Sequence, residues 1–157
     1  FDFCSRQHML IILHTGCDPG PWESPALSAN ARPSLYAGLI GTYSDVPVVL
    51  AHAGSYSIRQ PGIWLEEALE LCRKRDNVWL DLAAVTYLAV EEGFARRIRQ
   101  AVGFDRVLFG SDWPTVHRTS VSEALARIRA SRALTEQEKE GVLRENAREL
   151  LRKLGRA

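Results

Sequence analysis

The chain has 157 residues, of which 46% are hydrophobic and 25% are charged, and its formal net charge at pH 7 is +1. This composition is typical of a folded globular protein, and the near-neutral charge gives no electrostatic reason to expect a nucleic-acid partner. No apolar run approaches the roughly 18 to 20 residues of a membrane span, and the first residues lack the pattern of a signal peptide, so we expect a cytoplasmic protein without a membrane partner.

The cysteines add a further exclusion. Cys4, Cys17 and Cys72 are odd in number and show no C-x-x-C spacing. This pattern argues against a disulfide framework and against a thiolate zinc site. We therefore expect free thiols.

Short apolar runs alternate with longer amphipathic stretches along the chain. The first apolar run ends on His14, and the second run ends on His52. Runs of this length without polar alternation predict buried strands. The four predicted strands occupy residues 9–14, 46–54, 77–84 and 106–109.

Helices are predicted between and after these strands. Pro33 suits the first turn of a helix over 32–43, and a second helix opens at Pro61. A third covers 88–102, and two more close the chain. The closing helices begin with S/T-x-x-E capping boxes, which are formed by Ser120 with Glu123 and by Thr135 with Glu138.

Strands separated by helices predict an α/β fold with a parallel sheet, and uninterrupted apolar strands predict that helices cover both of its faces. No long linker or low-complexity tract divides the sequence. We therefore expect residues 1–157 to form a single domain or part of one.

Polar side chains stand where three of these strands end. His14, His52 and Asp112 each follow an apolar run. The carboxyl ends of parallel strands meet at one edge of a sheet, where loops can hold side chains over a cavity. A structural histidine or a turn-capping aspartate explains any one of them, but three in one short chain favour a shared site.

The segments LIILHTG, PVVLAHAG, NVWLDLAA, RVLFGSDWP and LTEQEKEGVLRENARELL together resemble the second half of an amidohydrolase-related protein. This is the branch of the metal-dependent amidohydrolase superfamily that includes aminocarboxymuconate semialdehyde decarboxylase. G-S-D-W-P and E-N-A-x-x-L-L are the more specific motifs. The resemblance implies a TIM-type (β/α)8 barrel, of which this chain supplies strands five to eight.

The resemblance also implies a role for each strand-end residue. His14 and Asp112 correspond to metal ligands, and His52 corresponds to a histidine that acts on the metal-bound water. A divalent ion, zinc or alternatively manganese, binds imidazole and carboxylate groups and lowers the pKa of its water to about 7. Asp112 would orient that water, and His52 would transfer a proton.

The sequence departs from the family in one respect. The family carries two further ligands in an H-x-H pair on its first strand, and this sequence contains no H-x-H. Neither His8 nor His117 replaces that pair. A complete barrel takes about 250 residues, so we expect a C-terminal piece of a longer protein, which alone would be inactive.

Two residues are candidates for substrate binding. Arg59, in the loop after His52, could clamp a carboxylate, or it could be a solvated surface residue. Trp113 could form a wall of the pocket or simply pack.

Two functions from different classes remain open. The first is a metal-dependent hydrolase or non-oxidative decarboxylase that acts on a small organic molecule through a metal-activated water. The second is a non-catalytic half-barrel that pairs through its open sheet edges with itself, as a homo-oligomer, or with another chain such as a missing N-terminal half.

Overall fold

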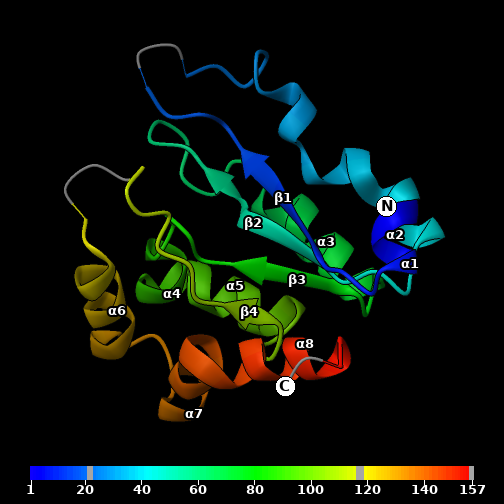
Figure 1. Cartoon of the computed structure of the whole chain (residues 1–157). Coiled ribbons are helices and arrows are strands. Elements are labelled where there is room, and N and C mark those ends of the chain that lie inside the picture. The colour runs from blue at the N-terminus through cyan, green and yellow to red at the C-terminus, as the bar shows by residue number, and fades with distance from the viewer. Residues whose placement is uncertain (21–22, 116–118, 156–157) are drawn as a thin grey trace. The chain divides into compact units, whose positions relative to one another are not determined.

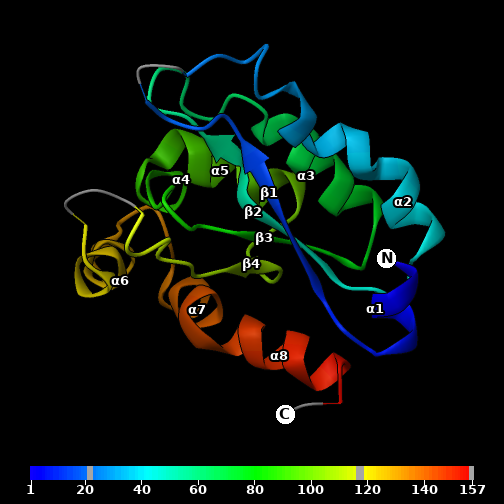
Figure 2. The ribbon, with the colours of Figure 1, turned by 45° about the horizontal axis from the view of Figure 1, so that its top comes forward.

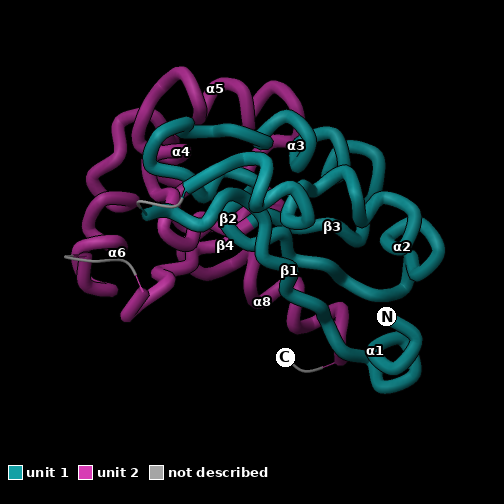
Figure 3. The backbone as a smooth tube through the Cα atoms, turned by 90° about the horizontal axis from the view of Figure 1, so that it is seen from above, with its two compact units in different colours: residues 1–80 teal, residues 81–157 magenta. Residues whose placement is uncertain are grey.

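A computed structural model describes residues 1–20, 23–115 and 119–155. The chain divides into two compact units, which Figure 3 shows in different colours. Unit 1 comprises residues 1–80, and unit 2 comprises residues 81–157. The expectation that the whole chain is a single partial domain stays a prediction.

Unit 1 contains the long strands. Its order is α1 (Asp2–Arg6), β1 (Ile11–Gly16), two 3-10 helices η1 (Ala29–Ala31) and η2 (Pro33–Tyr36), α2 (Ala37–Thr42), β2 (Val48–Tyr56), α3 (Leu65–Lys74) and β3 (Val78–Asp81), whose last residue opens unit 2. Pro33 stands in the first turn of η2, as predicted.

The three strands of unit 1 are parallel. Leu50 of β2 pairs with Leu13 of β1 on one side and with Leu80 of β3 on the other. Figure 1 shows the three arrows pointing the same way. Parallel neighbours need a crossover, and α2 and α3 lie in the two connections. The predicted α/β class with a parallel sheet is confirmed.

The first two strands, β1 and β2, differ in burial. β2 is buried from Val48 to Ser55, whereas β1 alternates, and Ile12 is 65% exposed. The expectation that both faces of every strand are covered is therefore wrong for β1. Within unit 1, β1 pairs with β2, and the alternation marks β1 as a strand with one covered face.

Helix α3 packs on β2 through one apolar face. Its buried side chains are those of Leu65, Ala68, Leu69, Leu71 and Cys72. Figure 2 shows α2 beside α3. The helix begins at Leu65 rather than at Pro61, because residues 61–64 form a turn in which the Leu65 N–H bonds to the carbonyl of Gly62.

Unit 2 consists mainly of helices. They are α4 (Tyr87–Val90), α5 (Glu92–Ala101), α6 (Val121–Ala130), α7 (Glu136–Glu140), the π-helix η3 (Gly141–Glu145) and α8 (Asn146–Lys153), with the strand β4 (Val107–Leu108) between α5 and α6. Leu82, which follows β3, donates its N–H to the carbonyl of Leu108 at 3.0 Å.

The helix boundaries of unit 2 correct one prediction and confirm two. The predicted helix over 88–102 is broken at Glu91, whose backbone is extended, so that α4 and α5 are separate. Both capping boxes are present, because the side chains of Ser120 and Thr135 each accept the N–H of the glutamate three residues later. None of the helices in the described residues is long and apolar enough to cross a membrane.

Candidate functional site

Two histidines of β1 and β2 meet toward the carboxyl edge of the sheet, where the pairing of the two strands becomes irregular. The ring centroids of His14 and His52 are 5.0 Å apart, with the rings at 70° to one another. His52 is only 4% exposed, whereas the His14 side chain is about half exposed. The sequence-based prediction placed both at this edge, and the structure brings these two together.

The backbone of β2 does not end at His52, as the sequence predicted. His52, Ala53 and Gly54 all have positive φ, and the strand resumes through Tyr56. The register shows the same irregularity: β1 advances from residue 14 to 16 while β2 advances from 51 to 56. The additional residues form a bulge, which redirects the His52 side chain.

A buried hydroxyl fixes this bulge. Oγ1 of Thr15 donates to the carbonyl of Ala51 and accepts the N–H of Gly54 at 2.8 Å. On the far side, the Gly54 carbonyl accepts the N–H of Trp64 at 3.1 Å. A side chain at residue 54 would meet the Trp64 carbonyl oxygen at 2.6 Å, so only glycine fits there.

Tyr56 belongs to the same cluster and was missed from the sequence. Its ring stacks on His52 with centroids 4.3 Å apart and planes 18° apart, and its centroid lies 5.8 Å from that of His14. The sequence gives no signal for this contact, because the bulge brings residue 56 opposite Gly16 instead of leaving it in the following loop.

A cavity of about 310 Å³ opens beside His14. Its size is at the lower end of the range of small-molecule sites. Within it, Oδ1 of Asp18 lies 3.7 Å from Nε2 of His14. The cavity is lined by His14, Gly16, Asp18, Leu27, Ser28, Asn30, Ala31 and Tyr36.

Asp112, the third predicted member, lies in unit 2, so its place beside the histidines stays a prediction. Its backbone has a φ of +57°. Its Oδ2 is buried, and among the described residues it has no hydrogen-bond partner. A buried carboxylate oxygen without a partner is costly, and a cation at this position would relieve that cost.

The strand before Asp112 is held by the C-terminal motif. Nδ2 of Asn146 donates to the carbonyl of Phe104 at 2.7 Å and to that of Val107 at 2.8 Å. The N–H of Phe109 donates to the Val142 carbonyl in the π-helix η3. The E-N-A segment therefore supports the β4 region structurally.

The two predicted substrate-binding residues are exposed. Trp113 is 63% exposed, and its N–H bonds to Oγ of Ser111. Arg59 is exposed, and its backbone N–H donates to Oε1 of Glu23 at 3.1 Å. Arg59 belongs to unit 1 and Trp113 to unit 2, and the substrate-binding roles of both stay predictions. His117 lies outside the described residues.

The described residues contain no group of three or more His, Cys, Asp or Glu side chains placed to hold a metal ion. The histidine pair supplies donors of the right chemistry for a divalent transition metal, and Asp112 supplies a carboxylate. The donor types therefore fit the predicted ion, but the ligand set within either unit is incomplete.

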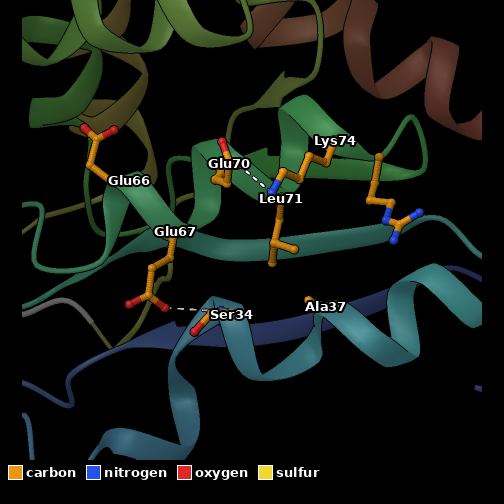
Figure 4. Close-up of a pocket in the computed structure, with 8 residues that line it drawn as sticks. Ser34, Ala37, Glu66, Glu67, Glu70, Leu71 and Lys74 are labelled. Carbon is orange, nitrogen blue, oxygen red and sulfur yellow. Dashed lines mark hydrogen bonds and ion pairs between the residues drawn. The ribbon is translucent and has the colours of Figure 1, made fainter.

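A second cavity, of about 620 Å³, lies between η2–α2 and α3. Figure 4 shows that charged side chains line it: Lys74 pairs with Glu70 at 2.7 Å, and Glu67 accepts the N–H of Ser34 at 3.2 Å. Glu67 also pairs with Arg32, and none of the described residues that line this cavity is a histidine. Of the predicted site residues, His14 lines the smaller cavity.

The sequence of residues 1–153 matches the family model described as amidohydrolase. The chain belongs to the amidohydrolase family. No curated protein sequence matches this amidohydrolase chain. The family resemblance predicted from the strand-end motifs is confirmed at the level of the superfamily.

Solved structures show the same fold. An uncharacterised TIM-barrel protein from Bordetella bronchiseptica is 23% identical with a TM-score of 0.69, and 99% of this chain covers 50% of that one. A putative 2-pyrone-4,6-dicarboxylic acid hydrolase from Pseudomonas putida is 19% identical with a TM-score of 0.65, and the match covers 95% of this chain and 54% of that one. A dihydroxybenzoic acid decarboxylase from Polaromonas, with bound manganese and the inhibitor 2-nitroresorcinol, is 16% identical with a TM-score of 0.65. That match covers 99% of this chain and 53% of the decarboxylase. This amidohydrolase chain thus spans about half the length of these structures.

Proposed function

We propose that this chain contributes to a metal-dependent hydrolase or non-oxidative decarboxylase that acts on a small organic molecule. The observation that carries the proposal is the pair of histidines on β1 and β2, whose ring centroids are 5.0 Å apart and of which His14 lines a cavity of about 310 Å³. Family membership supports it, and hydrolases and decarboxylases stand among the proteins of similar fold.

The proposed cofactor is a divalent ion, zinc or manganese. His14 would hold it from β1, and Asp112 is the proposed second ligand. Such an ion lowers the pKa of water to about 7 and polarises a substrate oxygen. A neighbour of similar fold contains manganese, which supports a divalent ion without deciding between the two metals.

The proposed chemistry assigns a different task to each side chain. His52 is buried and held by the bulge, so it can hold and deliver a proton without competition from bulk water. The carboxylate of Asp112 would orient the attacking water through an oxygen that the described residues leave without a hydrogen bond. Hydrolysis and decarboxylation use the same groups.

Arg59 and Trp113 are the proposed substrate contacts. A guanidinium binds a carboxylate through two parallel hydrogen bonds, which suits aromatic or pyrone acids such as those named for the neighbours. Trp113 is 63% exposed, so its indole is available to cover an apolar ring.

The finer fold proposal is that the chain is the second half of a (β/α)8 barrel, with its strands in places five to eight. Coverage of 50–54% of the neighbours supports it. The H-x-H ligands and the other wall of the cavity would then come from an N-terminal half, so we expect the 157-residue chain alone to bind metal weakly and to turn over little substrate.

The second candidate function is a non-catalytic half-barrel that associates with a second copy or another chain. The exposure of Ile12 on β1 favours it, because an exposed apolar strand invites pairing with another strand. Sedimentation at several concentrations separates the two candidates: self-association without metal binding supports this second one.

Calorimetric titration with zinc or manganese tests the first candidate. We expect a weak site in the chain that the His14→Ala variant loses and that the Asp112→Asn variant weakens. Exposed His8 provides the control, because His8→Ala removes an imidazole that precedes β1. Mixing with an N-terminal half that carries H-x-H should tighten binding and restore turnover.

Two results would contradict this proposal. Equal metal affinity in the His8→Ala and His14→Ala variants would show that the ion binds elsewhere. Submicromolar affinity and turnover by the isolated chain would show that its ligand set needs no second half.

A further inference from the structure

A buried carboxylate joins the two loops that follow β1 and β2. Glu23, in the first loop, is only 8% exposed. Its Oε1 accepts the hydroxyl of Ser57 and the N–H of Arg59 at 3.1 Å, and its Oε2 accepts the N–H of Ile58 at 3.2 Å. One side chain thus fixes three consecutive residues of the second loop.

The loop after β2 also contains a hydrogen bond between two of its own residues. Oγ of Ser57, which donates to Glu23, also accepts the N–H of Gln60 at 2.8 Å. The carboxylate therefore organises a compact turn over 57–60. Burial by itself would raise the pKa of Glu23, but the hydrogen bonds from Ser57, Arg59 and Ile58 outweigh it and hold the pKa below its usual value. These three donors therefore favour the ionised carboxylate of Glu23.

This turn begins directly after Tyr56, the residue whose ring stacks on His52. The backbone of Tyr56 is held on its other side by Gly16, whose pairing leaves no room for a side chain: a Cβ on residue 16 would meet the Tyr56 nitrogen at 2.4 Å. The backbone on both sides of Tyr56 is therefore held, and the centroid of its ring lies 4.3 Å from that of the His52 imidazole.

We propose that Glu23 and Tyr56 are positioning residues for His52: Glu23 fixes the turn over 57–60, the turn fixes Tyr56, and the Tyr56 ring sets the plane of the His52 imidazole relative to His14. The inference rests on the proposed function only for what His52 does there; the geometric claim stands on contacts within unit 1.

The arrangement explains why the position of the imidazole needs support. His52 has a φ of +64°, a backbone conformation that residues other than glycine seldom adopt, so the local backbone alone does not favour it. The stacked Tyr56 ring limits rotation of the imidazole. A proton donor that is held in one orientation needs no reorganisation when it acts.

The experiment uses nuclear magnetic resonance of the metal-free 157-residue chain. In the wild type, the His52 ring protons should show the upfield ring-current shift of a stacked aromatic pair. The Tyr56→Leu variant should lose this shift and Tyr56→Phe should keep it, because phenylalanine restores the ring. These two variants identify the Tyr56 ring as the source of the shift, so that a change of the same signals in a variant elsewhere reports movement of His52 relative to that ring.

Glu23 is tested through two readouts in the same chain. In Glu23→Ala, the amide protons of Ile58 and Arg59 should exchange about tenfold faster or more, because each loses its charged acceptor. The His52 signals should move toward those of Tyr56→Leu. Glu23→Gln, which keeps one acceptor oxygen, should give intermediate values and serves if the alanine variant fails to fold.

Glu66→Ala provides the matched control, since it removes an exposed carboxylate of α3 in the same unit. The proposal is overturned if Glu23→Ala speeds exchange at Ile58 and Arg59 but moves the His52 signals no more than Glu66→Ala does. It is also overturned if Tyr56→Leu leaves the His52 signals unchanged.

A zinc titration of the same samples separates this inference from the proposed function. Loss of the ring-current shift in Tyr56→Leu and Glu23→Ala supports the positioning role even if zinc binds none of the proteins, in which case the proposed function fails alone. If zinc binds through His14 and the shift is insensitive to both variants, the proposed function survives and the positioning role is refuted.

Discussion

The two units hold their strands in different ways. In unit 1, β2 is paired on both sides by backbone hydrogen bonds and is buried over most of its length. In unit 2, β4 has two residues, and the side chain of Asn146 caps the carbonyls of Val107 and Phe104. The position of β2 depends on many buried apolar residues, whereas that of β4 depends on the side-chain amide of Asn146.

This difference indicates how strongly a single substitution should disturb the segment that carries each predicted site residue. The histidine pair rests on a sheet whose stability is spread over many contacts. The segment that leads to Asp112 rests on a few polar contacts, each of which can be removed by one substitution. The predictions below test this contrast in order of decreasing effect.

Leu50→Ala should have the largest effect. The side chain is fully buried in the middle of β2, so the substitution leaves a cavity and should lower the free energy of unfolding by about 2–5 kcal/mol, measured by urea denaturation. Ile12→Ala on β1 is the control, and because that side chain is 65% exposed we expect a change within about 0.5 kcal/mol. Equal losses would show that β1 is covered after all.

Gly16→Ala should disrupt the link between β1 and β2. The residue has a φ of +127°, and a Cβ would meet the Tyr56 nitrogen at 2.4 Å, so backbone strain alone should cost about 1–3 kcal/mol in the free energy of unfolding. Gly38→Ala in α2 meets nothing within 4 Å and should instead stabilise by about 0.5–1 kcal/mol. A neutral Gly16→Ala would mean that the bulge adapts.

Asn146→Ala tests the polar support of unit 2. It leaves two buried carbonyls without their donor, which should cost about 1–3 kcal/mol in the free energy of unfolding. Gln137→Ala on α7, an exposed amide in the same unit, should change it by less than about 0.5 kcal/mol. If both variants behave alike, β4 is held by packing instead.

The ion pair of Arg99 with Glu138 should give the smallest effect. Hydrogen bonds from Arg99 hold the pKa of Glu138 below its usual 4.5, against the opposing influence of burial. Because the pKa is depressed in the folded state, the stabilisation is present above about pH 4.5 and is lost as the pH falls through the folded value. The Arg99 side chain is 36% exposed, so solvent screens the pair and we expect only about 1 kcal/mol.

The measurement compares the wild type with Glu138→Gln by urea denaturation from pH 7 to pH 3. The difference in the free energy of unfolding should be present at pH 7 and shrink toward zero below pH 4.5. A difference that is independent of pH would show that the charge of Glu138 does not stabilise the fold.

Much of the fold follows from the sequence because apolar runs and capping boxes act locally. The strands, the parallel α/β class and the caps at Ser120 and Thr135 were predicted correctly. What failed depends on contacts between distant residues. The exposure of Ile12 depends on what lies across from β1. The break at Glu91 is followed by Gly93, but a single glycine is tolerated within a helix and does not by itself predict a break.

In the candidate site too, the features that local sequence patterns determine were predicted, and those that depend on distant contacts were not. The strand-end positions of His14 and His52 follow from the apolar runs, and the structure brings their rings together. Tyr56 and Glu23 were missed because their roles arise from a bulge after His52 and from a loop that returns to it. No local pattern encodes either contact.

Line broadening by manganese tests the central claim, that this chain binds a divalent ion at the histidine pair. When Mn²⁺ is added in small steps to the isotope-labelled chain, the signals of His14, of the adjacent His52 and of the proposed ligand Asp112 should broaden first. If the acidic face of α3, with Glu66 and Glu70, broadens first while the histidine signals stay sharp, the ion binds to surface carboxylates and the proposed site is wrong.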